Sequence, residues 1–167
     1  MLPEFRRQRE VNSPGPAYAI MTKANDPVEF AGEGYELKLD VTIPATLTAV
    51  EDVVARIVAL LHEMEFGEEK EYGVTLAVHE ALVNAVTHGA NSDPGKNVRC
   101  CVASNTAKSI VIMVRDPGPG FDPQVVPDCK EAESIYSGHG RGVYLMAKLM
   151  DKIEFHERGT EVRLKKS

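Results

Sequence analysis

The sequence has 167 residues, of which 43% are hydrophobic and 26% are charged, the balance of an ordinary globular domain. Its net charge of −6 argues against a protein whose main function is to bind nucleic acid, because such proteins usually carry a basic patch. This length fits one domain better than two, and it can bury a core without a metal or disulfide.

The first 33 residues are predicted to form a flexible leader, because prolines and glycines interrupt them and their apolar positions show no period. We assign residues 34–167 to one folded domain. At its start, residues 35–41 alternate between apolar and polar side chains, which predicts a half-buried strand that ends at Pro44.

Two helices are predicted next. Thr48 and Glu51 have the spacing of a capping box, and the apolar stripe that follows them predicts a helix as far as Gly67. A second stripe at helical period predicts a helix over residues 68–87, which Gly89 and a polar cluster close.

The remaining elements are mostly strands. Residues 97–104 and 109–115 read as two strands joined by a polar turn, and a loop rich in glycine and proline continues from 116 to about 137. A third helix is predicted over residues 143–150. The chain then ends in a predicted hairpin, with strands at 152–157 and 160–165. This order favours an α/β fold in which helices cover one face of a mainly antiparallel sheet.

The cysteines and the hydropathy indicate a cytoplasmic protein. Cys100 and Cys101 are adjacent, Cys129 is alone, and none belongs to a Cys-x-x-Cys pair, so we expect reduced thiols. The sequence has no apolar run of the signal-peptide type at its start and no stretch near the roughly 18 apolar residues of a membrane span.

The first of three motifs lies on the second predicted helix and reads Glu80-Ala-Leu-Val-Asn84-Ala-Val-Thr-His88-Gly89. A spacing of four residues places Glu80, Asn84 and His88 on one helical face. The amide oxygen of an asparagine suits Mg²⁺, and a glutamate one turn away can accept a proton from a hydroxyl group or water. Taken alone, an ordinary solvated helix face explains this pattern better.

The second motif directly follows an apolar strand and reads Asp116-Pro-Gly118-Pro-Gly120-Phe121-Asp122. A carboxylate at the end of a buried strand can accept a hydrogen bond from an exocyclic amine such as that of adenine. Glycines two and four residues later let the backbone approach a planar ligand closely. An ordinary turn of prolines and glycines is an equally good explanation.

The third motif precedes the third predicted helix and reads Gly138-His139-Gly140-Arg141-Gly142. Glycines at the start of a helix leave N–H groups available, and the helix dipole favours an anion there, which suits a triphosphate. A flexible linker is the alternative. Two other signatures do not fit, because Lys96 lacks the following Ser or Thr of a P-loop and Val83 replaces the second His of a zinc protease.

In this order and on these elements, the three motifs resemble the N, G1 and G2 boxes of the GHKL ATPase superfamily. The likeness covers residues 35–165. Within the superfamily, the motif of the second helix and the compact size are similar to anti-sigma-factor serine kinases, as is the ending Gly159-Thr160-Glu161-Val162-Arg163-Leu164. The resemblance implies an α/β two-layer sandwich with a mixed, mostly antiparallel sheet and ATP on its helical side.

The resemblance also implies a role for each motif residue. Asn84 would bind Mg²⁺ and Glu80 would be the general base, whereas we expect a structural role for His88 at the helix end. Asp116 would bind the adenine amine. The other nucleotide-binding residues would be Gly118, Gly120, Gly138, Gly140, Arg141, Gly142 and Thr160, with residues 122–137 as a lid.

The function implied by the resemblance is that of an ATP- and Mg²⁺-dependent serine/threonine-protein kinase. Such kinases bind a sigma factor, phosphorylate a serine on a small anti-sigma-factor antagonist, often act as homodimers, and thereby regulate transcription without binding nucleic acid or membranes. The family often carries a basic residue just before the glycines of the third motif, where this chain has Gly138. The alternative is therefore a non-catalytic, ATP-gated protein-binding module of the same fold.

Overall fold

A computed structural model describes residues 29–121 and 141–167 of the chain. Residues 1–28 of the predicted leader and the predicted lid at 122–137 lie outside this part. In chain order the elements are β1 (Glu36–Pro44), α1 (Leu47–Glu63), α2 (Glu68–Asn84), the π-helical turn η1 (Ala85–Gly89), β2 (Asn97–Ser104), β3 (Ile110–Arg115), α4 (Arg141–Leu149), β4 (Lys152–His156), the 3-10 turn η3 (Glu157–Gly159) and β5 (Glu161–Lys166).

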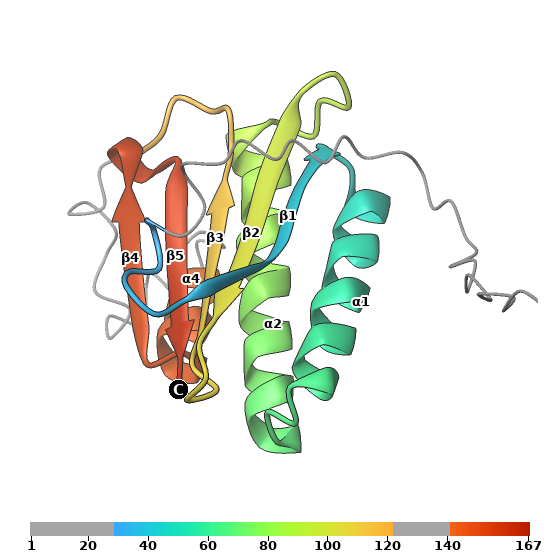
Figure 1. Cartoon of the computed structure of the whole chain (residues 1–167). Helices are drawn as coiled ribbons and strands as arrows, with labels where there is room; N and C mark the ends of the chain where they lie inside the picture. The colour runs from blue at the N-terminus through green and yellow to red at the C-terminus, as the bar shows by residue number, and fades with distance from the viewer. Residues whose placement is uncertain (1–28, 122–140) are drawn as a thin grey trace, which may run out of the picture.

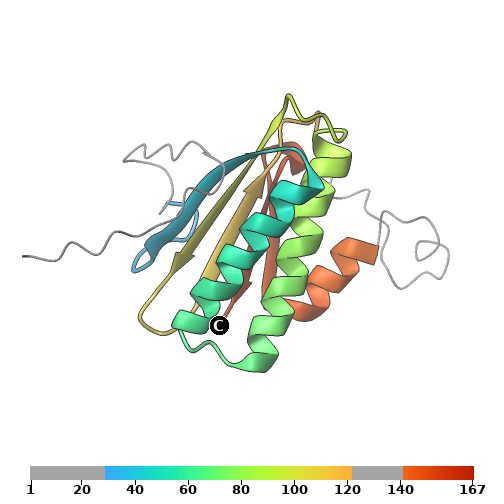
Figure 2. The same ribbon diagram turned by 90° about the vertical axis from the view of Figure 1, so that its right-hand side faces the viewer.

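The five strands of the described chain form one sheet in the order β1-β2-β3-β5-β4, and every neighbouring pair is antiparallel. β5 therefore lies between β3 and β4, although β4 directly precedes it in the chain. α1, α2 and α4 cover one face of this sheet, as Figures 1 and 2 show. The predicted two-layer α/β sandwich is confirmed, and its sheet, predicted to be mixed and mostly antiparallel, has only antiparallel pairs in the described residues. None of the helices in residues 29–121 and 141–167 combines the length and the apolarity needed to span a membrane.

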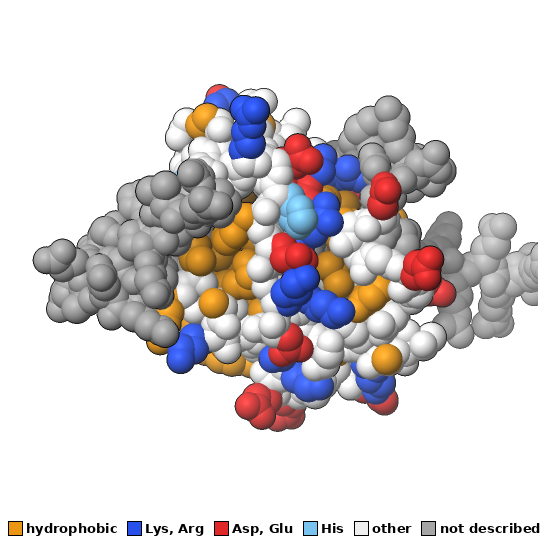
Figure 3. Space-filling view, turned by 90° about the vertical axis from the view of Figure 1, so that its left-hand side faces the viewer, with side chains coloured by type: hydrophobic (Ala, Val, Ile, Leu, Met, Phe, Trp, Pro, Cys, Tyr) orange, Lys and Arg blue, Asp and Glu red, His pale blue; other side chains and the backbone are white. Residues whose placement is uncertain are grey.

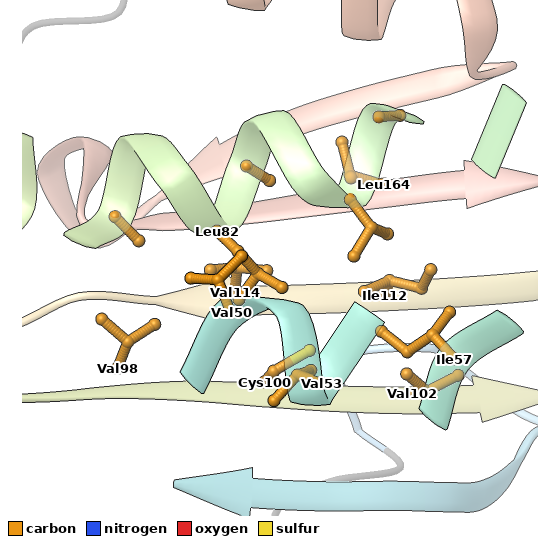
Figure 4. Packing of buried hydrophobic residues seen from close by; sticks show 14 of the residues in the cluster. Val50, Val53, Ile57, Leu82, Val98, Cys100, Val102, Ile112, Val114 and Leu164 are labelled. Atoms are coloured by element: carbon orange, nitrogen blue, oxygen red, sulfur yellow. The ribbon is translucent and has the colours of Figure 1, made fainter. Parts of the chain in front are cut away.

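A single apolar core holds α1 and α2 against the sheet. Successive side chains of a strand point to opposite faces, so each strand contributes every second residue to this core. Figure 4 shows side chains from both helices meeting those of three strands. The buried residues labelled there are Val50, Val53 and Ile57 of α1, Leu82 of α2, Val98, Cys100 and Val102 of β2, Ile112 and Val114 of β3, and Leu164 of β5.

The start of α1 differs from the prediction by two residues. The N-cap is Thr46, whose backbone is extended and whose Oγ1 accepts a hydrogen bond from the Ala49 N–H at 3.3 Å. Thr48 lies within the first turn instead. Glu51, the predicted second member of the capping box, contacts His79 of α2, with 3.1 Å between its Oε1 and the His79 Nε2. The capping box was therefore wrong, because the sequence offers two threonines and the helix uses the earlier one.

The face of the sheet opposite the helices carries paired charges, and Figure 3 shows Lys, Arg, Asp and Glu side chains gathered along its middle. On β1, the Asp40 side chain is only 6% exposed and accepts two hydrogen bonds from Arg99 of β2, at 2.9 and 3.0 Å. Cys101 also donates its thiol hydrogen to Asp40, with 3.2 Å between the Cys101 Sγ and the Asp40 Oδ1. Burial is the main reason that the pKa of the Cys101 thiol is raised to about 12. Cys100 and Cys101 are both free thiols, as expected, whereas Cys129 lies outside the described residues.

We predict that Thr46→Ala lowers the free energy of unfolding by about 1 kcal/mol, because it removes the side-chain acceptor of the N-cap. The matched variant Thr48→Ala should change it by less than about 0.5 kcal/mol, because Thr48 is exposed and caps nothing. Urea denaturation followed by circular dichroism measures both. The reverse ranking of the two variants would contradict the observed start of α1.

Candidate functional site

The first motif occupies the C-terminal half of α2 and the turn that follows it. Glu80 and Asn84 are both partly buried and lie one helical turn apart, as predicted. After Asn84 the helix widens into the π-helical turn η1, in which the Ala90 N–H donates to the Ala85 carbonyl oxygen at 2.8 Å. π turns inserted into α-helices are frequent at functional sites. His88 is exposed within this turn.

α4 begins directly beside Glu80 and Asn84. A Cβ atom placed on Gly142 would lie 2.9 Å from the Glu80 Oε2 and 3.1 Å from the Asn84 Nδ2. At the other end of α4, Leu149 lies next to Gly73 near the start of α2, so the two helices run antiparallel, side by side (Figure 2). Gly142 of the third motif therefore meets the first motif in the first turn of α4.

The second motif packs against the end of the π turn. A Cβ atom on Gly89 would lie 2.2 Å from the Asp116 Cγ, and one on Gly118 would lie 2.5 Å from the Gly89 carbonyl oxygen. A side chain at either glycine would collide with these atoms, so both positions need glycine. The Asp116 Oδ1 also accepts a hydrogen bond from the Gly118 N–H at 2.7 Å, which fixes the carboxylate beside η1.

The chain from Asp116 to Phe121, here called the Asp116 loop, is also held by the turn that leads into β5. The Asp116 N–H donates to the Thr160 carbonyl oxygen and the Phe121 N–H to that of Arg158, each at 2.9 Å. Gly120 has a φ of 76°, and a Cβ atom there would lie 2.1 Å from the Arg158 carbonyl oxygen. Only glycine satisfies both conditions.

Burial raises the pKa of Asp116 above the ordinary carboxyl value, although the hydrogen bond from the Gly118 N–H acts in the opposite direction. The carboxylate is thus only partly solvated, which strengthens any hydrogen bond that it accepts from a ligand. A half-buried carboxylate with a raised pKa is a feature typical of functional sites.

The structure thus brings together residues of all three motifs around the C-terminal end of α2: Glu80, Asn84, Asp116, Gly118, Gly120, Arg141, Gly142 and Thr160. Gly138 and Gly140 lie outside the described residues. Gly89 was predicted only as the end of a helix, and its contact with Asp116 was not predicted. Its place as the last residue of the first motif, directly after His88, was the available signal.

Comparison with known proteins shows the family to which this domain belongs. Residues 43–166 match the family described as the histidine kinase-like ATPase domain. The chain belongs to that family. The domain is also similar to the anti-sigma F factor of Heyndrickxia coagulans, with 29% identity over 121 residues that cover 66% of this chain and 79% of the relative. The ATPase family predicted from the three motifs is therefore confirmed.

Among solved structures, the domain resembles a chain in the crystal structure of the SiaB-SiaC complex from Pseudomonas aeruginosa. The TM-score is 0.57 at 14% identity, and the match covers 78% of this chain and 89% of that chain. At this identity the likeness concerns the fold, and it agrees with the sheet and helix arrangement described above.

The residues of this histidine kinase-like ATPase domain suit a magnesium-bound adenine nucleotide. Asp116 supplies the acceptor that an exocyclic amine requires, and Gly118 and Gly120 let its loop pack closely against Gly89 and Arg158. Asn84 supplies a neutral oxygen of the kind that Mg²⁺ binds. The first turn of α4 supplies N–H groups suited to phosphate oxygens.

We predict that Asp116→Asn raises the thermal unfolding midpoint at pH 7. Because the folded-state pKa of Asp116 is raised, its contribution to stability is full below the ordinary carboxyl pKa and is lost as the pH rises through the folded-state value. An asparagine does not ionise and can still accept the hydrogen bond from the Gly118 N–H. The gain over wild type should therefore shrink at pH 3.

The control for this prediction is Asp93→Asn. Asp93 is exposed and accepts the same kind of hydrogen bond from the N–H two residues later, that of Gly95, at 2.9 Å. Differential scanning calorimetry should show little change in this control. A lower midpoint for Asp116→Asn at pH 7 would contradict the assigned effect of burial.

Proposed function

We propose that this domain binds ATP with Mg²⁺ and transfers the γ-phosphoryl group to a serine of a small antagonist protein. The observation that supports it best is the meeting of Gly142 with Glu80 and Asn84, next to the contact between Gly89 and Asp116. The C-terminal end of α2 thus lies next to a candidate adenine acceptor, Asp116, and carries a candidate metal ligand, Asn84.

At the adenine end, we propose that Asp116 accepts a hydrogen bond from the exocyclic amine of the base. Its Oδ1 is already bound to the Gly118 N–H, so the carboxylate is held in one orientation. Gly118 and Gly120 of the same loop would lie beside the base, and Thr160 stands beside this end because its carbonyl oxygen binds the Asp116 N–H.

At the phosphate end, we propose that the Asn84 side-chain oxygen binds the metal. Mg²⁺ would neutralise the charge that develops on the phosphate oxygens. Arg141 and Gly142 lie in the first turn of α4, where the helix dipole favours anions, and we propose that they bind the phosphates together with Gly138 and Gly140 of the same motif.

For the transfer itself, we propose that Glu80 accepts the proton of the serine hydroxyl group. The serine oxygen then attacks the γ-phosphorus in line with the departing ADP. Glu80 suits this role because it lies beside both Gly142 and, one turn along α2, Asn84. The relative named anti-sigma F factor supports a sigma factor as the second partner. We extend the proposal to a cytoplasmic homodimer, as is usual for such kinases.

A second function is favoured by Gly138, which stands where related kinases often carry a basic residue. In that case ATP would only set the shape of a protein-binding surface, and no phosphoryl group would be transferred. Both functions require the same nucleotide site, so they differ only in the need for Glu80 as a base.

We predict that Glu80→Ala lowers the rate of serine phosphorylation by about 100-fold or more, as is typical for removal of a general base. Purified protein would be incubated with Mg-ATP and the small candidate antagonists of its source organism, and phosphoserine would be measured by mass spectrometry. Glu69→Ala, at an exposed position in the first turn of α2, is the matched control and should retain the wild-type rate. Full activity of Glu80→Ala would contradict the base assignment, and phosphoserine in no antagonist would favour the non-catalytic module.

A further inference from the structure

A buried carboxylate belongs to the last residue pair between β3 and β5, Arg115 and Glu161, here called the last rung. It lies on the face of the sheet opposite the helices. Glu161 is 0% exposed and pairs with Arg115 across this rung. Arg115 donates hydrogen bonds to the Glu161 Oε2 from Nε, at 2.8 Å, and from Nη2. Arg163 donates from Nε to the Glu161 Oε1 at 2.6 Å. Both carboxylate oxygens are therefore bound by guanidinium groups.

The residues next to this ion cluster belong to the candidate nucleotide site. Arg115 directly precedes Asp116, Glu161 directly follows Thr160, and the Asp116 N–H donates to the Thr160 carbonyl oxygen at 2.9 Å. The ion cluster lies on one face of the sheet. The Asp116 carboxylate lies at the other, beside Gly89 at the end of α2. Any displacement of this rung would therefore also displace Asp116.

We propose that Glu161 is a positioning residue for adenine recognition, which holds Arg115 and Arg163 and thereby fixes the strand ends that carry Asp116 and Thr160. It acts from the opposite face of the sheet and does not touch the nucleotide. The inference rests on the proposed function in one respect, namely that Asp116 accepts a hydrogen bond from the base.

Charge explains why this position can control the strand ends. Burial alone would raise the pKa of Glu161, but the hydrogen bonds from Arg115 and Arg163 hold it below the ordinary value, so Glu161 is ionised at neutral pH. Neutralising it would leave the guanidinium groups of Arg115 and Arg163, which are 45% and 26% exposed, side by side without the charge that binds them both. The strands can relieve the repulsion by separating at their last rung.

Displacement of Asp116 should weaken recognition of the adenine base more than binding of the phosphates and the metal. Recognition sites need their groups held to within about 0.5 Å, so a small shift of Asp116 weakens a hydrogen bond to the adenine amine. The proposed phosphate and metal contacts come from α2 and α4, which the ion cluster does not touch. A loss of base preference with retained triphosphate binding therefore separates a positioning role from a general loss of stability.

The sheet offers a matched control on the same face. Asp40 is also a buried carboxylate, with 6% of its side chain exposed, and it is also bound by an arginine through two hydrogen bonds. It lies on the edge strand β1, which is separated from β3 by β2. Asp40→Asn should therefore destabilise the sheet without changing base preference.

The experiment measures dissociation constants of the full chain for Mg-ATP and for magnesium inosine triphosphate, which has a carbonyl oxygen in place of the adenine amine. We expect wild type to prefer ATP by about tenfold or more, as for a hydrogen bond to a charged group. In Glu161→Gln this preference should fall by about fivefold or more, while the affinity for inosine triphosphate changes less than about twofold. Asp40→Asn should keep the wild-type preference.

An unchanged ATP preference in folded Glu161→Gln would overturn the inference and leave the proposed function intact. Absence of ATP binding by wild type would instead contradict the proposed function. If Glu161→Gln does not fold, Arg115→Met decides in the same way. Arg115 is 45% exposed and its loss leaves Glu161 paired with Arg163, so this variant should fold. It should lose base preference because it removes the side-chain link between β3 and β5 at this residue pair.

Discussion

The candidate site depends on how closely two other segments approach the C-terminal end of α2, and three glycines allow that approach. The Asp116 carboxylate lies where a Gly89 side chain would be, and the Gly118 backbone meets that of Gly89. On the neighbouring side, Gly142 lets the first turn of α4 lie against Glu80 and Asn84. A Cβ atom at Gly89 or Gly118 would push the second motif away from α2, and one at Gly142 would crowd the side chains of Glu80 and Asn84. The site can therefore assemble only where these side chains are absent.

The two faces of the sheet differ in the interactions that hold the site together. The helical face is apolar and holds α2 in place, whereas the opposite face carries Asp40 and Glu161, two buried carboxylates neutralised by arginines. Asp116 lies at the end of β3, where no arginine within residues 29–121 and 141–167 neutralises it, and burial raises its pKa. An unneutralised half-buried carboxylate lowers stability, and such a cost is typical of positions kept for binding.

Much of this fold could be predicted from the sequence, because the apolar periods of α1, α2 and the strands are strong local signals. The order of elements and the final hairpin were predicted correctly, as was the face shared by Glu80 and Asn84. Three features carry no local signal. The insertion of β5 between β3 and β4 is decided by pairing over long distances in the chain, the π turn depends on what packs against it, and the contact of Glu161 with Arg115 needs both strands in register. The choice of Thr46 over Thr48 as the N-cap was missed because both residues suit that position.

The most direct test of the central claim, that residues around the end of α2 form one magnesium-nucleotide site, is calorimetric titration of ATP with and without Mg²⁺. We predict that wild-type binding depends on Mg²⁺ and that Asn84→Ala weakens Mg-ATP binding by about tenfold or more, as expected for a lost bond to a charged group. Asn97→Ala, an exposed asparagine at the start of β2, should bind as wild type does. Equal, magnesium-independent binding by wild type and Asn84→Ala, or no binding by either, would contradict the account.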